Sequence, residues 1–523
     1  MTPGTDKTSL HQVSPEDWEA ALRVVDAQKV AIFVVAYNAE SHIRATLNRI
    51  PAELIAKLAN IYVIDDTSSD QTTSVARRSQ EALPHLEVFC TPSNQGYGGN
   101  QKLGYQYAIQ EGYDVVVLLH GDGQYAPEVL PRLLAPFETR ETAAVFGSRM
   151  MTRGAARRGG MPLYKYVGNR ILSSLENRLL EADLSEFHSG YRAYRVQDLA
   201  QLPFQYNTDD FHFDTEIIIQ LLTKGKKIVE VPIPTYYGDE ICHVDGLAYA
   251  FNCMSTVLRS KANQVYLVYH PKFDLDDDDS YVFKESPSSL HQYVVNRTWS
   301  AGTKVLELGA GHGQVGLTLH EKWGAKVVAI DLVRPQKSFP YPYLETDLNG
   351  AFADDAVAAL DGQADVVLAL DVIEHLSRPE ESLQEIKRAL LPGGTLVAST
   401  GNVAFILQRL MLLLGQFNYG KKGILDLTHQ RLFTLRSFRR TLQGEGFKVE
   451  SFRGFGPPIE DMVGNSMLLR WLDRFWGSLA KVWPSLFGYQ FVVEARRLDE
   501  IEDILASTLE SEGKAEAPVK EKG

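Results

Sequence analysis

Apolar residues gather in short, nearly continuous runs along the first half of the chain. These runs cover residues 30–36, 61–64 and 115–119, and a helical pattern over residues 41–58 separates the first two. Continuous runs rich in β-branched residues are typical of strands that a parallel sheet buries on both faces. Strands that alternate with helices predict an α/β domain.

The second half repeats this organisation. Residues 304–308 and 364–370 are further strand candidates, VVAIDL places Asp331 at the end of another, and LPGGTLVAST (391–400) predicts a turn and a strand. We therefore predict an α/β protein of two domains.

A polar stretch separates these halves. FDLDDDDSY and ESPSS combine a dense acidic run with Pro and Ser, and four consecutive aspartates (276–279) are typical of a solvated, self-repelling segment. A calcium site is the alternative, but the spacing of an EF-hand loop is absent. The predicted boundaries are an N-terminal extension (1–28), a first domain (29–265), a linker (266–290), a second domain (291–495) and a C-terminal tail (496–523).

Composition narrows the function classes. The chain has 523 residues, and a net charge of -13 argues against a nucleic-acid partner, since phosphate neutralisation needs concentrated Lys and Arg. Three widely spaced cysteines indicate a reducing compartment, and the N-terminus lacks a signal peptide's apolar core. We expect a cytoplasmic protein without a transmembrane segment. For the apolar stretch 403–414 we favour a buried lid helix, with interfacial attachment to a lipid-linked acceptor as the alternative. Peripheral association would place the protein at the inner face of the plasma membrane.

Candidate chemistry follows two strands of the first domain. After residues 115–119 comes His120-Gly121-Asp122-Gly123-Gln124, and Asp65 and Asp66 follow residues 61–64. In open α/β sheets ligands bind beyond the carboxyl ends of the strands, where Asp122 and Gln124 offer oxygen ligands to Mg²⁺ or Mn²⁺ carrying a diphosphate. Asp65 and Asp66 could hydrogen-bond a base or ribose. The alternatives are an ordinary turn for the first segment and a helix N-terminus for the second.

Together these segments resemble the family 2 glycosyltransferases of GT-A fold, in particular the branch with dolichol-phosphate mannose synthase and bacterial polyprenyl-phosphate sugar synthases. The resemblance is carried by VVAYNAE (34–40), IDDTSSD (64–70), NQGYGGNQKLGYQYAI (94–109), LLHGDGQY (118–125), GSRM (147–150), SGYRAYR (189–195) and FDTEIIIQ (213–220).

The resemblance implies roles for individual residues. Ala36, Tyr37 and Glu40 would line the nucleoside pocket and Asp65 would meet the base, with Asp66 beside it in the nucleotide-sugar site. Asp122 and Gln124 would hold the metal, and Arg149 would approach the donor phosphates. The family commonly has an acidic DxD triplet at the metal, whereas its first position here is His120. A metal site with one carboxylate is expected, with a donor-binding relic as the alternative.

The implied reaction is attack of an acceptor oxygen on the anomeric carbon of a nucleotide-activated sugar. An alcohol acceptor would need a carboxylate base, whereas an ionised phosphate acceptor would not. NTDDFHFDTE offers Asp209, Asp210 and Asp214, of which Asp210 is the first choice by resemblance and Asp214 the second catalytic candidate.

The second domain opens with a glycine-rich turn, ELGAGHG, between a strand and a helical pattern. Such a turn lets the backbone approach a cofactor closely. With Asp331 and LPGG, it resembles the class I S-adenosylmethionine-dependent methyltransferases, whereas a dinucleotide dehydrogenase would show GxGxxG. By resemblance, the cofactor-binding residues are Glu307, Gly309, Gly311 and Gly313 at the methionine end, Asp331 at the ribose, Asp347 at the adenine, and Asp371.

A cluster of acids and histidines follows residues 364–370. Asp371, Glu374 and His375 would share one face if a helix begins there. The matching positions in ubiquinone-biosynthesis O-methyltransferases form a cluster implicated in metal binding, and a helix-capping Asp with a packed His is the reading we favour. His429, next to Thr428, is a candidate base near the acceptor.

The expected protein is a bifunctional enzyme. It would transfer a sugar from a nucleotide-sugar to a saccharide or lipid-linked (polyprenyl-phosphate) acceptor and methylate a substrate of the same pathway, in surface-polysaccharide or glycolipid synthesis. Two alternatives remain, an inactive saccharide-binding module attached to a lone methyltransferase and a scaffold of a polysaccharide assembly complex.

Overall fold

The chain forms two compact units in the computed structural model, which describes residues 12–83, 85–235, 245–264, 268–275, 289–457 and 467–499. One unit comprises residues 1–264 and 270–277, and the other comprises residues 265–269 and 278–523. The acidic run 276–279, Cys242, residues 1–11 of the predicted extension and residues 500–523 of the predicted tail lie outside the described residues.

A seven-stranded sheet forms the centre of the first unit, in the order β3-β2-β1-β4-β6-β5-β7. Its strands are β1 (Val30–Ala36), β2 (Asn60–Asp65), β3 (Leu86–Cys90), β4 (Val115–His120), β5 (Thr142–Ser148), β6 (Arg192–Arg195) and β7 (Lys227–Pro232). Strands β1 to β4 are parallel, whereas β6 runs antiparallel to both β4 and β5. Every residue of β1 and β2 is buried, as continuous apolar runs predict.

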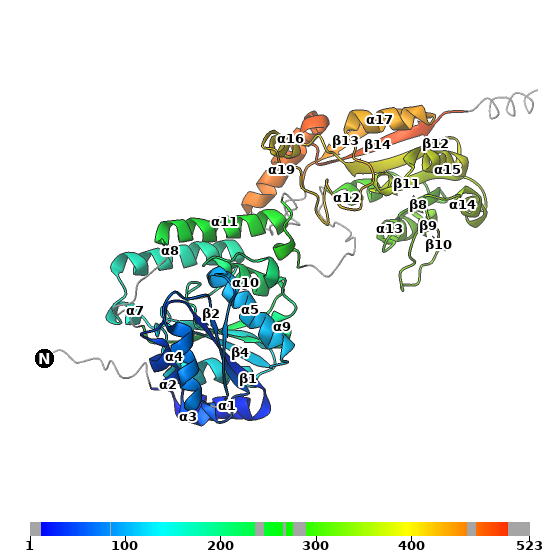
Figure 1. Ribbon diagram of the computed structural model, residues 1–523. Coiled ribbons are helices and arrows are strands. Elements are labelled where there is room, and N and C mark those ends of the chain that lie inside the picture. Colours follow the sequence, from blue (N-terminus) through cyan, green and yellow to red (C-terminus); the bar gives the residue numbers. More distant parts are fainter. Residues whose placement is uncertain are drawn as a thin grey trace, which may run out of the picture. The chain divides into compact units, whose positions relative to one another are not determined.

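Helices cover this sheet. They are α1 (Pro15–Ala27), α2 (Ile43–Asn48), α3 (Ala52–Ile55), α4 (Thr72–Arg78), α5 (Gly96–Gln110), α6 (Leu130–Leu134), α7 (Ala155–Arg158), α8 (Leu163–Leu180), α9 (Val196–Leu199), α10 (Phe213–Thr223) and α11 (Gly246–Gln264). Two short helices, α2 and α3, replace the continuous pattern predicted over residues 41–58, because Pro51 has no N–H with which to continue a helix. Helices α8 and α11 lie side by side (Figure 1).

The second unit is built on another seven-stranded sheet, in the order β10-β9-β8-β11-β12-β14-β13. Its strands are β8 (Lys304–Leu308), β9 (Lys326–Asp331), β10 (Tyr343–Glu345), β11 (Ala364–Leu370), β12 (Leu390–Gly401), β13 (Phe447–Phe455) and β14 (Gln490–Arg497). Strands β8 to β12 are parallel, and β14 is antiparallel to its neighbours β12 and β13.

The helices of this unit are α12 (Leu290–Val295), α13 (Gln314–Trp323), α14 (Ala353–Ala359), α15 (Pro379–Ala389), α16 (Ile406–Leu413), α17 (Leu435–Gly444), α19 (Met467–Val482) and α20 (Pro484–Phe487). The predicted two-domain α/β class is confirmed, with a GT-A-like unit followed by a Rossmann-like unit. In the part of the chain that the structure describes, no helix combines the length and apolarity that crossing a bilayer requires.

The predicted linker differs from the structure at its start. Residues 271–273 form a short 3-10 helix whose Phe273 is buried against α10 and α11. Lys272 pairs with Glu216 of α10 at 2.5 Å, and the Glu216 side chain is fully buried. These residues belong to the core of the first unit because they neutralise and cover a buried carboxylate.

Candidate functional sites

The predicted donor site lies where the chain order of the first sheet reverses. Strand β1 stands between β2 and β4, and a cavity of 1340 Å³ opens beyond the carboxyl ends of β1 and β4. Such a switch point is the usual ligand site of an open α/β sheet. Residues from β1, β4, α5, α8 and α11 line the cavity.

Asp122 and Gln124 both face this cavity. The turn that carries them closes with a hydrogen bond from the Gln124 N–H to Asp122 Oδ1 at 3.0 Å, and Gly123 adopts a positive φ of 78° within it. A carboxylate and a carboxamide oxygen on one turn fit a hard divalent cation, whose remaining positions a diphosphate would fill. The donor set therefore suits Mg²⁺ or Mn²⁺.

His120 packs among aromatic rings in the wall of the cavity. Its ring meets Tyr125 edge-on at 5.0 Å between centroids, and its Nε2 lies 3.3 Å from the Tyr97 hydroxyl. Burial lowers the pKa of His120, so the imidazole is neutral at pH 7. A Cβ at Gly190 would come within 2.5 Å of His120 Nε2, so glycine is required there.

The predicted nucleoside residues divide into two groups. Ala36 and Tyr37 line the cavity, and the Tyr37 side chain is available to a base because the residue is 51% exposed. Glu40 is not among the lining residues, and its carboxylate accepts the Gln71 N–H at 3.0 Å.

The two carboxylates after β2 also differ. Asp65 lies outside the cavity lining and accepts hydroxyl hydrogen bonds from Ser68 and Thr73. Asp66 lines the cavity, but its oxygens accept the N–H groups of Gln95 at 2.7 Å and Gly96 at 2.9 Å. These hydrogen bonds shape the loops around β2 and the start of α5.

Arg149 reaches the cavity while paired with a buried acid. Its Nη2 lies 2.5 Å from Glu186 Oε1 and donates to the carbonyl of His188 at 2.9 Å. Burial by itself would raise the pKa of Glu186, but the charge and hydrogen bonds of Arg149 outweigh it and the net shift is downward. The guanidinium therefore stands at the cavity wall with its charge held in place.

The candidate bases Asp210 and Asp214 both line the cavity, but they differ in exposure and in the groups that they contact. The Asp214 side chain is 7% exposed, accepts from Tyr97 at 3.0 Å and lies 3.7 Å from the Arg192 guanidinium. The Asp210 side chain is 56% exposed, and the ion pair that it forms is with His212 at 3.8 Å. Asp209, with a 69% exposed side chain, pairs with Lys102 at 2.7 Å. The Asp210 carboxylate is therefore accessible to a ligand, whereas Tyr97 and Arg192 hold the Asp214 carboxylate in place.

Two apolar stripes beside the cavity did not figure in the sequence analysis. On α8, the exposed apolar side chains are Leu163, Tyr164, Val167, Ile171 and Leu175, and on α11 they are Leu247, Phe251 and Leu258. Tyr164 and Leu247 also line the cavity. Spacings of three, four and seven residues place each set on one helix face, so periodicity could have found them.

In the second unit, the glycine-rich turn joins β8 to α13. Gly309, Gly311 and Gly313 all have positive φ, between 51° and 65°. A Cβ at Gly309 would meet Val372 at 2.4 Å and one at Gly313 would meet Phe339 at 2.4 Å, whereas nothing lies within 4 Å of a Cβ at Gly311. The turn is thus packed at both ends and open in the middle, which fits close approach of a cofactor.

Glu307, on β8, connects this turn to the start of α13 through a hydrogen bond. Its residue is 5% exposed, and Oε2 accepts the Gly316 N–H at 3.0 Å. Burial raises its pKa to about 8, with a smaller contribution from the Asp331 charge. The hydroxyls of Tyr341 and Tyr343, which sequence reasoning missed, donate to the carbonyls of Gly313 and Gly311 at 2.9 Å each.

The predicted cofactor carboxylates end successive strands. Asp331, at the end of β9, accepts the Gly311 N–H at 2.7 Å, which joins it to the glycine turn. Asp347 is exposed beyond β10, and hydrogen bonds from Asn349 lower its pKa. Asp371 follows β11 and accepts Ser399 at 2.7 Å and Gln490 at 2.9 Å.

The acid and histidine cluster forms by long-range packing. Residues 373–375 make a 3-10 turn, so the α-helical face expected for this segment is absent. His375 Nδ1 lies 3.0 Å from Thr428 Oγ1, and its ring meets His429 edge-on at 4.7 Å. Burial, followed by the His375 charge, lowers the pKa of His429. His429 is thus a neutral base at pH 7.

The buried lid helix predicted over residues 403–414 is wrong at its C-terminal end. Helix α16 covers residues 406–413, and Leu410, Leu412, Leu413 and Leu414 are between 46% and 82% exposed. Phe405 and Asn402 at its start are buried, so the segment is anchored at its beginning alone.

Comparisons with known proteins agree with this division. Residues 31–202 match the family described as glycosyl transferase family 2, and residues 281–451 match a methyltransferase domain. An undecaprenyl-phosphate mannosyltransferase of Micrococcus luteus is 29% identical over 39% of this chain and 82% of its own length. A polyprenol monophosphomannose synthase of Mycolicibacterium smegmatis is 27% identical over 39% of this chain and 77% of its own length. The solved glucosyl-3-phosphoglycerate synthase of M. tuberculosis covers 49% of this chain and 85% of its own, at 18% identity and a TM-score of 0.35.

Proposed function

We propose that this chain, in which a family 2 glycosyltransferase domain is joined to a methyltransferase domain, transfers a sugar from a nucleotide donor to a polyprenyl phosphate and methylates a saccharide of the same pathway. The observation that carries the first half is the cavity beyond β1 and β4, which combines Asp122 and Gln124 with Arg149 and borders exposed apolar stripes. Two of the relatives named above are an undecaprenyl-phosphate mannosyltransferase and a polyprenol monophosphomannose synthase, which supports a polyprenyl phosphate as the acceptor here.

Each group in the first unit has a defined task. Asp122 and Gln124 would hold a divalent cation that neutralises the departing diphosphate. Tyr37 offers a ring to the base, and Arg149 adds positive charge at the same wall. An ionised phosphate is its own nucleophile, so the acceptor needs no proton removed and Asp210 would orient rather than deprotonate it.

The stripes on α8 and α11 distinguish a lipid-linked acceptor from a free saccharide. Soluble monomers rarely expose contiguous large apolar patches without a binding role. Tyr164 and Leu247 bring the stripes to the border of the polar cavity, so an isoprenoid chain could lie along the stripes while its phosphate enters the cavity.

In the second unit, the glycine turn, Asp331 and Glu307 would hold S-adenosylmethionine, whose sulfonium supplies an activated methyl group. His429 stands ready to accept the proton of a saccharide hydroxyl, since its neutral imidazole retains a lone pair at pH 7. The remaining work of this unit is to position that hydroxyl in line with the methyl group.

The decisive experiment supplies the full chain with a panel of nucleotide sugars, Mg²⁺ or Mn²⁺, and either undecaprenyl phosphate or soluble saccharides. We expect labelled sugar to enter the lipid fraction and a Val167→Glu, Ile171→Glu double variant to lose this transfer while still hydrolysing the donor. Glycan mass spectrometry of cells with and without the gene then identifies the methylated sugar. No turnover of any nucleotide sugar by the folded chain would instead favour a binding module attached to a lone methyltransferase.

A further inference from the structure

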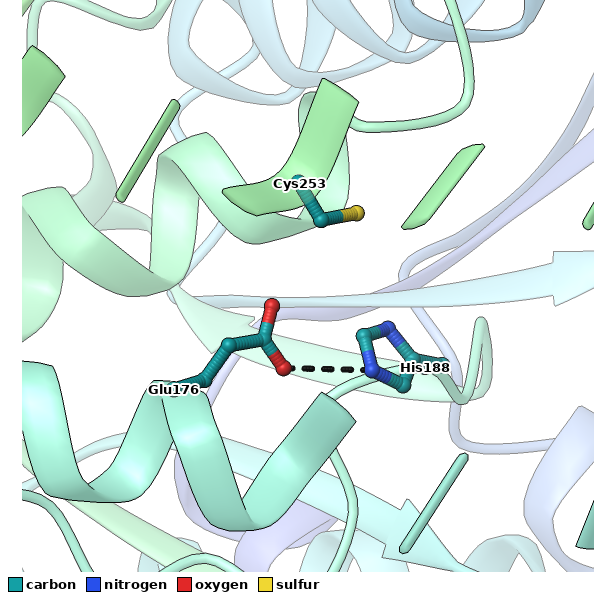
Figure 2. A group of neighbouring side chains, drawn as sticks. All are labelled: Glu176, His188 and Cys253. Atoms are coloured by element: carbon teal, nitrogen blue, oxygen red, sulfur yellow. Dashed lines mark ion pairs between the residues drawn. The ribbon is translucent and has the colours of Figure 1, made fainter. Parts of the chain in front are cut away.

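Two buried side chains and one partly buried side chain in the first unit converge from three separate segments (Figure 2). Glu176 projects from α8, His188 from the loop before β6, and Cys253 from α11. One carboxylate oxygen, one imidazole nitrogen and the thiol sulfur lie within 4.8 Å of one another. None of these residues belongs to the turn that carries Asp122 and Gln124, although His188 also lines the donor cavity.

The Glu176 carboxylate is unusual among the buried groups of the described chain. Its side chain is fully buried, and neither oxygen has a hydrogen-bond partner among the residues that the structure describes. His188 Nε2 lies 3.1 Å from Oε2, yet it too makes no hydrogen bond in that part of the chain. The two atoms form an ion pair only if His188 is protonated, and with a neutral imidazole their close approach is that of two ligands of one ion.

The surroundings orient the other two side chains. Tyr249 places its hydroxyl 3.1 Å from His188 Nδ1, which leaves Nε2 turned toward Glu176. Thr215 donates its hydroxyl to Cys253 Sγ at 3.3 Å. Hydrogen bonds of this kind, made by the atoms that do not ligate, typically orient metal ligands in proteins.

We propose that Glu176, His188 and Cys253 bind a zinc ion at a structural site distinct from the Mg²⁺ or Mn²⁺ of the donor cavity. Thiolate, imidazole and carboxylate together are a ligand set that zinc accepts and that magnesium does not. Tetrahedral zinc with bonds of about 2.0–2.3 Å spaces its ligand atoms by about 3.3–3.8 Å. The cluster therefore needs to contract by roughly 1 Å at its widest separation when the ion enters.

The position of the site gives the ion a role. It would fasten α11 to α8, the two helices that carry the apolar stripes, and would also hold the loop at His188. The backbone carbonyl of His188 accepts from Arg149 at 2.9 Å, so the same ion would steady the guanidinium at the donor cavity. Binding converts the Cys253 thiol to a thiolate and releases its proton to solvent.

The test measures metal in the purified full chain rather than sugar transfer. After incubation with zinc and gel filtration in Mg²⁺ buffer, we expect about one zinc per chain in the wild type and about none in Cys253→Ala. Cys90→Ala is the matched control, because Cys90 is an exposed free cysteine in the same unit, and it should retain the ion.

Substitution with Co²⁺ provides a second readout, which shows whether the Cys253 thiolate is a metal ligand. The wild type and Cys90→Ala should show a thiolate-to-cobalt charge-transfer absorption, and Cys253→Ala should lack it. Two results would overturn the site: a wild-type chain that takes up neither zinc nor cobalt, which would leave a Glu176–His188 ion pair, or an undiminished band in Cys253→Ala. The wild-type measurement decides even if a variant fails to fold.

Discussion

Three buried carboxylic acids of the first unit and two of the second are held in opposite ways, although the first unit also buries Asp65, Asp66 and Glu176 without a Lys or Arg partner in its described part. In the first unit, Glu186 is paired with Arg149, Asp214 lies beside Arg192, and Glu216 is paired with Lys272. In the second, Glu307 and Glu374 are buried with no cation among the causes of their pKa shifts, and burial raises the pKa of each to about 8.

This difference matches the charges of the proposed ligands. A nucleotide sugar would bring a diphosphate, and Arg149, which Glu186 holds in place, lines the proposed donor cavity, whereas Arg192 and Lys272 are not among its lining residues. S-adenosylmethionine brings a sulfonium and an ammonium group, and a site without cations avoids repelling them. The contrast at these five acids agrees with the donors proposed for the two units.

The largest effect is expected at Asp122. Asp122→Asn removes the negative ligand of the proposed metal, so sugar transfer should fall by several kcal/mol of transition-state stabilisation, about a thousandfold or more. S-adenosylmethionine binding should not change, because the substitution lies in the other unit. Transfer is measured with labelled donor, and Glu138→Gln, at an exposed pair with Arg23, serves as the control. Near-normal transfer by Asp122→Asn would remove this residue from the site.

The next effect tests the second unit alone. Asp331→Ala should weaken S-adenosylmethionine binding at least tenfold, since hydrogen bonds to a charged acceptor contribute roughly 1.5–3 kcal/mol each. Asp331 also accepts the Gly311 N–H, so the turn loses a support as well. Calorimetry on the full chain gives the affinity, with Asp354→Ala at an exposed pair with Arg388 as the control. Unchanged affinity would mean that the cofactor is held elsewhere.

The effect of Asp210→Asn on kcat distinguishes an ionised phosphate acceptor from an alcohol acceptor. With an ionised phosphate acceptor, Asp210→Asn should change kcat by less than about threefold, because no proton has to be removed; with an alcohol, the loss of a general base should reach about a hundredfold or more. The assay compares undecaprenyl phosphate with soluble saccharides in the same variant. A large loss on the lipid phosphate would contradict the role given to Asp210.

The last prediction concerns the pH dependence of stability. The pKa of Glu307 is about 8 in the folded chain against 4.5 as its ordinary value, so the unfolded chain releases this proton first as pH rises. The free energy of unfolding should therefore fall between about pH 5 and 8, and Glu307→Gln should flatten the slope, leaving a share from Glu374. The measurement follows the thermal transition that S-adenosylmethionine shifts. An identical slope in wild type and variant would show that Glu307 ionises normally.

Much of the fold follows from local pattern. The predicted strands over residues 30–36, 304–308 and 364–370 have the observed bounds of β1, β8 and β11, because fully buried parallel strands are continuous apolar runs. Helices α8 and α11 were not predicted, since their most visible apolar residues face outward rather than toward the sheet. Pro51 likewise divided a pattern that periodicity alone had joined.

Sequence predicted several residues of the donor site but not the contacts that hold them. Sequence placed Asp122 and Gln124 beyond β4, and both line the cavity. It could not show that Ser68 and Thr73 donate hydrogen bonds to Asp65, or that Glu186 pairs with Arg149. No local sequence pattern marks these contacts, which depend on the folded chain. The cluster of Glu176, His188 and Cys253 spans 77 positions of sequence with no recognisable spacing.

The buried pair between Lys272 and Glu216 determines where the gene can be divided. A fragment that ends at residue 265, the predicted boundary, would discard Lys272 and strand a buried negative charge, a loss of about 3–5 kcal/mol for such pairs. That fragment would express poorly and be scored as inactive for reasons unrelated to its chemistry. A fragment that ends after residue 275 keeps the pair, so its activity can be assayed without this loss of stability.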